Sequence, residues 1–94
     1  MSYNLKFKEE AWKEWQKLDS TIKEVFKKKI RERLIEPKIE SARLKGMTDC
    51  YKIKLRGLGY RLVYQVREME LVVSVIAVGK RDKSAVYKIA QKRF

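Results

Sequence analysis

Positively charged side chains alternate with apolar ones in two neighbouring segments, and this alternation predicts two β-strands. The first segment contains Lys52 and Lys54, and the second contains Arg61. The link between them, residues 56–59, suits a type II′ hairpin turn with Gly57 first, which sets Lys54 directly opposite Arg61. Like charges in that position destabilise a sheet, and an anion bound between them would relieve the repulsion. The sequence therefore predicts an anion site at this hairpin.

The apolar residues of the two segments support the same register. Six apolar side chains fall on one face of the hairpin, in the pairs Leu55–Tyr60, Ile53–Leu62 and Tyr51–Tyr64. A slip of one residue would scatter them over both faces, so the register is well specified.

A third predicted strand brings more cations to the same place. If the next hairpin pairs Val66 with Leu71, Arg61 lies opposite Ile76, and the chain leaves the sheet at Gly79, near the end that holds Arg61. A tyrosine one turn into the predicted last helix overlooks this end. The predicted cluster comprises Lys52, Lys54, Arg61, Arg81 and Tyr87, with Arg56 and Lys80 as further phosphate contacts.

Such a cluster suits the cleavage of RNA by its own 2′-hydroxyl. That reaction needs a base for the hydroxyl proton, cations for the phosphorane and an acid for the leaving 5′-oxygen. A lysine serves as a base only if its pKa falls below about 10.4, and neighbouring cations push it downward while a bound phosphate pushes it upward. The site is strong in electrostatics and weak in proton transfer, so a partner that positions the RNA would help.

The composition narrows the classes of function. The chain has 94 residues, which predicts a single domain over 1–94, and its formal net charge of +12 indicates a polyanionic partner. The absence of histidine removes the commonest general base and metal ligand, so we expect no metal site and no cofactor. One cysteine, no signal-peptide pattern and no membrane-spanning run favour a cytoplasmic protein.

The hydrophobic pattern predicts an α+β fold. The order is strand, helix, helix, three strands and a short C-terminal helix. We expect the helices, the two N-terminal ones above all, to pack on one face of a mainly antiparallel four-stranded sheet. Asp19 is a good cap for the second helix, and Pro37 ends it. The lysine run 27–29 is predicted to be a solvent-facing part of that helix, and the run 71–78 a strand covered on both sides.

Three segments, 50–56, 59–66 and 78–81, closely resemble the RelE toxins of bacterial toxin–antitoxin systems, and the likeness covers nearly the whole chain. The resemblance implies the RelE-like microbial RNase fold and a ribosome-dependent endoribonuclease that cuts mRNA in the ribosomal A site. It implies a metal-independent reaction that leaves a 2′,3′-cyclic phosphate and a 5′-hydroxyl. It also implies a base role for Lys54, an acid role for Arg81, transition-state stabilisation by Lys52 and Arg61, and substrate orientation and stacking by Tyr87.

The resemblance also implies partners and one departure. The partners are a RelB-like antitoxin, mRNA and the ribosome with its A-site rRNA. An acidic antitoxin suits a surface of net charge +12. Lys45 stands where close relatives carry arginine, so an RNA contact there loses the bidentate fork of a guanidinium but stays cationic.

Three alternatives remain open from the sequence. The ParE toxins, which share this fold by resemblance, act on DNA gyrase without cutting RNA, and the cation cluster argues against that function. A plain RNA-binding module would bind with a steep salt dependence and cut nothing. A basic face that is merely solvated is the third, since 24 of the residues are lysine or arginine.

Overall fold

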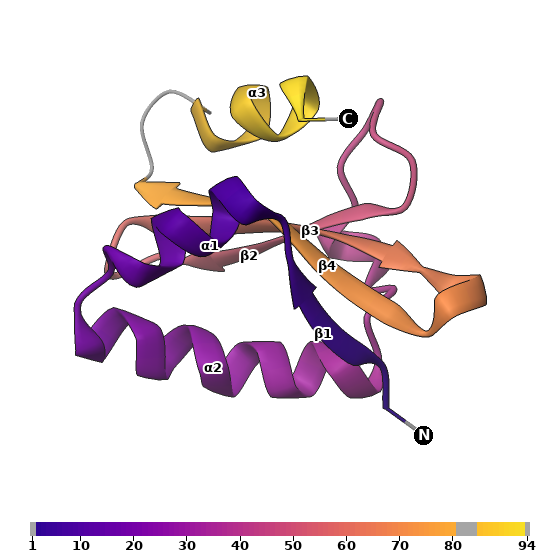
Figure 1. Ribbon diagram of the computed structural model, residues 1–94, viewed down its shortest axis with the longest axis horizontal. Helices are drawn as coiled ribbons and strands as arrows, with labels where there is room; N and C mark the ends of the chain where they lie inside the picture. Colours follow the sequence, from indigo (N-terminus) through magenta and orange to yellow (C-terminus); the bar gives the residue numbers. More distant parts are fainter. Residues whose placement is uncertain (1, 81–84, 94) are drawn as a thin grey trace.

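The computed structural model describes residues 2–80 and 85–93, which form one sheet with helices on both faces (Figure 1). The elements in chain order are β1 (Asn4–Phe7), α1 (Glu9–Gln16), α2 (Ser20–Ile35), the 3₁₀ turn η1 (Glu40–Ala42), β2 (Cys50–Leu55), β3 (Tyr60–Arg67), the 3₁₀ turn η2 (Glu68–Glu70), β4 (Val72–Lys80) and α3 (Ala85–Lys92). The strand order is β1-β4-β3-β2, with β1 parallel to β4 and the other neighbours antiparallel. The predicted α+β fold is confirmed, and its one parallel pairing makes the sheet mixed. The prediction that all helices pack on one face is wrong, because α3 covers the face opposite to α1 and α2.

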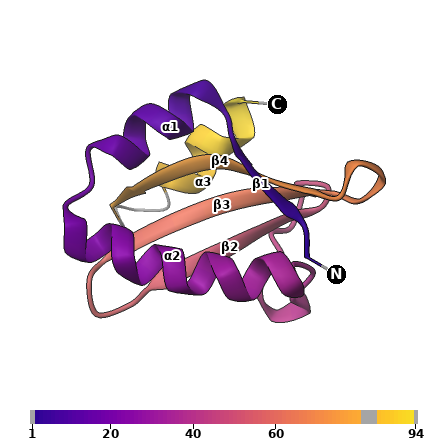
Figure 2. The same ribbon diagram turned by 60° about the horizontal axis from the view of Figure 1, so that its bottom comes forward.

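Apolar side chains form two clusters, one on each face of the sheet. Helices α1 and α2 cover one face, where their buried residues Ala11, Trp15, Ile22, Phe26 and Ile30 meet Tyr51, Ile53, Leu55, Leu62 and Tyr64. Helix α3 covers the other face, where Val86 and Ala90 meet Cys50, Val63, Ile76 and Ala77. Figure 2 shows α2 in front of the sheet and α3 behind it. Residues 72–78 of β4 are all buried, as the apolar run predicted.

The sequence signals at the start and at the end of α2 act as predicted. Asp19 lies at the N-cap, and its side chain accepts a hydrogen bond from the backbone N–H of Ile22 at 2.9 Å. The helix ends at Ile35, shortly before Pro37. Between these two limits, the buried residues Ile22, Phe26 and Ile30 of α2 pack on one face of the sheet.

The hairpin between β2 and β3 has the predicted register but a different turn. Leu55 pairs with Tyr60 and Lys54 pairs with Arg61, as the alternation required. The positive φ of the link lies at Gly59 (70°) rather than at Gly57, so the turn is not type II′. The carbonyl of Leu55 accepts hydrogen bonds from the N–H groups of residues 58 and 59, which closes a longer loop on the same strand pairing. The register of β2 and β3 is therefore set by the alternation of apolar and basic side chains, and the turn between them adopts a conformation that fits this register.

The predicted pairing of β3 with β4 is wrong. Val66 lies opposite Val73 rather than Leu71. The link is longer than expected because η2 intervenes and Leu71 adopts a left-handed conformation (φ 54°), so β4 begins only at Val72.

A β-bulge displaces the rest of β4 further. The pairing shifts between Val63 and Tyr64 of β3, and Ile76 is the residue that has no partner there. Arg61 therefore lies opposite Gly79 rather than opposite Ile76. The displacement brings Arg61 closer to the point where the chain leaves the sheet.

The hydroxyl of Tyr64 ties α2 to the sheet and offers a test of the packing. It donates to the Pro37 carbonyl at 2.6 Å and accepts a hydrogen bond from Nη1 of Arg33 at 2.9 Å. We expect Tyr64→Phe to lower the free energy of unfolding by about 1–3 kcal/mol, because it leaves buried polar groups without a partner. Urea unfolding measures the change, with Tyr60→Phe on the same strand as the control. Equal stability of the two variants would contradict this account.

Candidate active site

The site is built on the sheet face that α3 covers. Side chains alternate along a strand, so Lys52 and Lys54 share a face with Cys50, which belongs to the cluster under α3. Lys54 lies directly opposite Arg61 of β3. All three cations are only partly exposed. The structure thus brings together Lys52, Lys54 and Arg61, as the hairpin register predicted.

Crowding by these cations changes the acidity of Lys54. The pKa of its ammonium group is lowered, first by the charge of Lys52, then by partial desolvation and by the charges of Arg61 and Arg56. A lowered pKa increases the fraction of neutral amine, which is the form that accepts a proton. The sequence analysis had predicted that neighbouring cations would lower the pKa of Lys54.

Tyr87 of α3 lies next to Arg61. Nη1 of Arg61 donates a hydrogen bond to the Tyr87 hydroxyl at 2.8 Å, and the guanidinium carbon lies 5.5 Å from the centre of the ring. These contacts orient the guanidinium and the ring toward one another across two elements. A planar cation and an aromatic ring held in this way can grip a phosphate and stack on a base.

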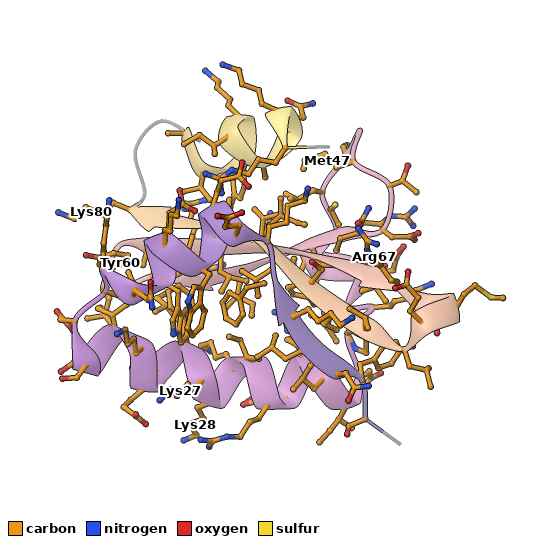
Figure 3. The ribbon with its side chains drawn as sticks, in the orientation of Figure 1. Lys27, Lys28, Met47, Tyr60, Arg67 and Lys80 are labelled. Carbon is orange, nitrogen blue, oxygen red and sulfur yellow. The ribbon has the colours of Figure 1, made fainter. Side chains whose placement is uncertain are left out.

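The chain leaves the sheet beside this cluster. Lys80 lies opposite Tyr60, one position beyond the pair of Arg61 with Gly79. Figure 3 shows Tyr60 and Lys80 at the same end of the sheet. Arg81, the predicted acid, lies outside the described residues.

Lys45 lies elsewhere. It belongs to the loop that precedes β2, in which the N–H of Leu44 bonds the carbonyl of Cys50. Cys50 and Lys54 are four positions apart on an extended strand, which corresponds to about 13 Å. The same loop carries Met47, which Figure 3 places at the end of the sheet away from Lys80. Lys45 lines a surface hollow of about 550 Å³ there, which is not the hollow that Lys54 borders.

Arg56 borders a different hollow, and with it lies a residue that the sequence analysis missed. A hollow of about 410 Å³ between α2 and the hairpin is lined by Lys29, Lys54 and Arg56, among others. Lys29 is exposed together with Lys27 and Lys28, as predicted for this part of α2. Its position on the hollow that Lys54 also borders follows from the packing of α2 against β2, which the spacing of lysines alone does not reveal.

Arg33 is a second residue that the sequence analysis missed. Its Nη1 donates a hydrogen bond to the backbone carbonyl of Lys52 at 3.0 Å and another to the Tyr64 hydroxyl at 2.9 Å. Arg33 therefore holds the strand that carries both site lysines. The one sequence signal for this structural role of Arg33 is its position in the last turn of α2, near Pro37.

Two kinds of feature are absent from the described residues. Across residues 2–80 and 85–93, no group of three or more carboxylate or cysteine side chains lies close enough to hold a metal ion. Over the same part of the chain, no helix is both long and apolar enough to cross a membrane.

Comparison with known proteins gives consistent matches. Residues 5–85 match the family model described as the ParE toxin of type II toxin–antitoxin systems, parDE. Over 93 residues the chain is 59% identical to the Escherichia coli K12 protein named mRNA interferase toxin RelE, covering 99% of this chain and 98% of that protein. The Shigella flexneri protein named mRNA interferase RelE matches at the same identity and coverage.

Solved structures agree with these matches. A double arginine-to-alanine variant of E. coli toxin RelE in the free state superposes with a TM-score of 0.91 at 57% identity, covering 100% of this chain and 99% of that one. The toxin in the intact E. coli RelBE toxin–antitoxin complex gives a TM-score of 0.84 at 57% identity, covering 87% of this chain and 100% of that one.

Proposed function

The chain belongs to the ParE toxin family of type II toxin–antitoxin systems, and within it to the RelE toxins, and we propose that it is an mRNA interferase toxin that cleaves mRNA in the ribosomal A site. The observation that carries the proposal is the placement of Lys54, with its lowered pKa, opposite an arginine that is bonded to Tyr87. The names of the full-length relatives support the same activity.

The proposed step is a phosphoryl transfer within the RNA. The neutral amine of Lys54 takes the proton of a 2′-hydroxyl, the 2′-oxygen forms a bond to the adjacent phosphorus, and the bond from phosphorus to the 5′-oxygen breaks. The departing 5′-oxygen takes a proton from an acid, a role that the family resemblance assigns to Arg81. The products are a 2′,3′-cyclic phosphate and a 5′-hydroxyl, and the protein residues alone supply the base and the cations.

The other site residues have distinct proposed roles. Lys52 and Arg61 stabilise the dianionic phosphorane, and Tyr87 orients and stacks on a base. Arg56 and Lys80 flank the cluster and contact neighbouring phosphates. Lys45, at the far end of the sheet, binds a more distant segment of mRNA or rRNA.

The weak proton-transfer groups explain why a ribosome is needed. Holding the attacking oxygen in line with the leaving oxygen supplies much of the barrier reduction that strong acids and bases would otherwise provide. We place the protein in the bacterial cytoplasm, where ribosomes and mRNA occur, and we expect a RelB-like antitoxin to neutralise it. The net charge of +12 favours an acidic partner.

Cleavage on programmed ribosomes tests the function directly. We expect purified protein to cut mRNA within the A-site codon, and a single 2′-deoxy nucleotide at the attacked position to abolish the cut. The upstream product should carry a cyclic phosphate by mass spectrometry, and a phosphorothioate at the cut linkage should need no Mn²⁺ for cleavage. Cutting of the 2′-deoxy message would refute attack by the 2′-hydroxyl.

The matching family model is named for the ParE toxins, which by the resemblance stated above act on DNA gyrase, and this gives a second candidate function without RNA cleavage. A supercoiling assay with purified protein separates the two candidates. Inhibition of gyrase together with intact mRNA on ribosomes would replace the interferase proposal with this one.

The pKa of Lys54 gives a prediction about pH. The base is the neutral amine, so the single-turnover rate should rise with pH until the pKa of Lys54 is passed. Lys52 is the first cause of the lowered pKa, so Lys52→Met should raise that pKa and move the profile to higher pH. Lys28→Met, which removes a charge on the outer side of α2, is the control (Figure 3). Profiles that coincide for the two variants would contradict the assignment of the base.

A further inference from the structure

The edge of β4 loses its strand partner halfway along. Strand β1 pairs with β4 only as far as Phe7 and Val75, and the N–H of Lys8 then bonds the Val75 carbonyl at 2.9 Å. Beyond that point β4 has a neighbouring strand on one side only. Backbone groups on the other side need partners from elsewhere, because buried unpaired N–H and carbonyl groups are costly.

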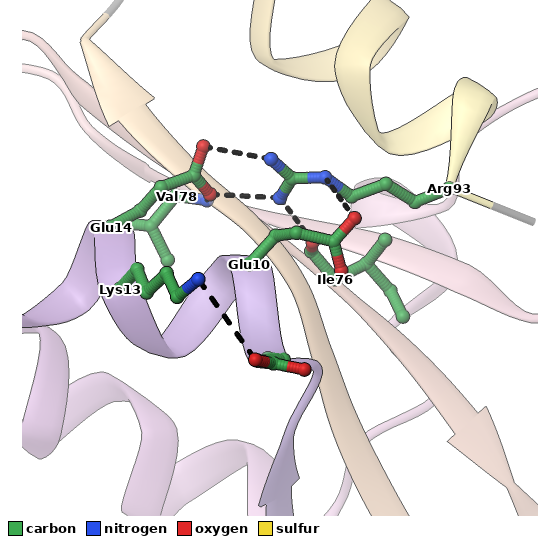
Figure 4. A network of polar contacts seen from close by, with 7 residues as sticks. Glu10, Lys13, Glu14, Ile76, Val78 and Arg93 are labelled. Atoms are coloured by element: carbon green, nitrogen blue, oxygen red, sulfur yellow. Dashed lines mark hydrogen bonds and ion pairs between the residues drawn. The ribbon is translucent and has the colours of Figure 1, made fainter.

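Two side chains supply these partners. The Glu14 carboxylate accepts a hydrogen bond from the N–H of Val78 at 3.1 Å, and Nη1 of Arg93 donates one to the Ile76 carbonyl at 2.8 Å. Glu14 and Arg93 also bind each other through two parallel bonds of 2.9 and 3.0 Å, with Glu10 3.9 Å from Nε of Arg93 (Figure 4). The pair continues the strand ladder where β1 has ended.

This pair differs from the other ion pairs between described residues. The side chains of Arg93 and Glu14 are 15% and 28% exposed, whereas the Lys13–Glu9 pair on the same helix is 68% and 84% exposed. Bidentate, partly desolvated pairs of arginine and carboxylate are the strong ones, and exposed pairs contribute little. The hydrogen bond from Arg93 to Glu14 also raises the pKa of Arg93.

The pair bears on the active site through α3. This helix has eight residues, of which Val86 and Ala90 are buried, and a helix so short depends on tertiary contacts for its position. Arg93 follows its C-terminal end and is held to α1 and β4, while Tyr87 near its start bonds Arg61. The helix is thus fastened at both ends.

We propose that the Glu14–Arg93 pair is a positioning device that holds α3 on the sheet and thereby keeps the Tyr87 ring beside Arg61. The inference rests on the proposed function for its link to catalysis, but the positioning itself is a property of the fold. Neither residue touches the cation cluster in the described residues, so their effect passes through Tyr87.

Hydrogen exchange tests the positioning without any RNA. We expect Arg93→Met and the isosteric Glu14→Gln to increase exchange of the amides of residues 88–92 at least tenfold, and to leave the amides of β3 protected. Lys92→Met and Lys13→Met are matched controls that remove neighbouring exposed charges. Unchanged protection of α3 in Glu14→Gln would overturn the proposal, and this holds even if Arg93→Met fails to fold.

A double-mutant cycle on programmed ribosomes tests the route to catalysis. We expect Arg93→Met alone to lower the single-turnover rate about 10- to 100-fold, because small misplacements of site groups are costly. In a Tyr87→Ala background the same change should have almost no further effect, since the group it positions is gone. Fully multiplicative losses would overturn the route through Tyr87. Absence of cleavage by the unmodified protein would refute the proposed function and leave the exchange result standing.

Discussion

Lys54→Met is expected to lower the single-turnover rate of mRNA cleavage on programmed ribosomes about 10²- to 10⁴-fold, the range that a general base contributes. The methionine keeps much of the side-chain bulk but cannot accept the proton. The repulsion that lowers the pKa of Lys54 disappears with the ammonium group, so the variant should also unfold at a higher temperature. A loss of activity together with a gain in stability separates a catalytic role from a structural one.

Two further variants sharpen this prediction. Lys54→Arg restores the positive charge but stays protonated at neutral pH, so it should be as inactive as Lys54→Met if proton transfer is the role. Lys27→Met, which removes an exposed charge that pairs with Glu24 on α2, should cut at the unmodified rate. Full activity of Lys54→Arg would show that Lys54 provides charge only, and the base would have to be sought elsewhere.

Arg61→Met should lower the same rate about 10²- to 10³-fold, which is typical for the loss of one group that stabilises transition-state charge. Two contributions disappear in this variant: a clamp on the phosphate oxygens and the hydrogen bond that orients Tyr87. Arg61→Lys keeps the charge without the planar fork, and we expect it to recover only part of the rate.

The contribution of Tyr87 can be separated from that of charge. Tyr87→Phe removes the hydroxyl that Arg61 bonds and retains the ring, so its loss should be smaller than that of Arg61→Met. Arg67→Met is the control for Arg61→Met, because Arg67 lies at the other end of β3 in an exposed pair with Glu70 at 3.6 Å (Figure 3). If Arg61→Met and Arg67→Met cut at the same rate, the cation cluster is not where the reaction occurs.

The sequence by itself determined the local features of this protein. The alternation of apolar and basic residues determined that Lys54 lies opposite Arg61, since side chains of a strand alternate strictly and one face had to be buried. The cap at Asp19 and the break at Pro37 set the limits of α2 for similarly local reasons. The electrostatic consequence, a lowered pKa of Lys54, followed from that register.

Only the tertiary structure decided the features that depend on distant segments. The left-handed Leu71 and the bulge at Ile76 set the pairing of Arg61 with Gly79, and no short pattern announces either of them. The contact of Arg61 with Tyr87 requires α3 to fold back over the sheet. Glu14 and Arg93 meet across almost the whole chain because a sheet edge there lacks its strand. Periodicity encodes which face a residue occupies, whereas the partner it meets is decided by how whole elements pack.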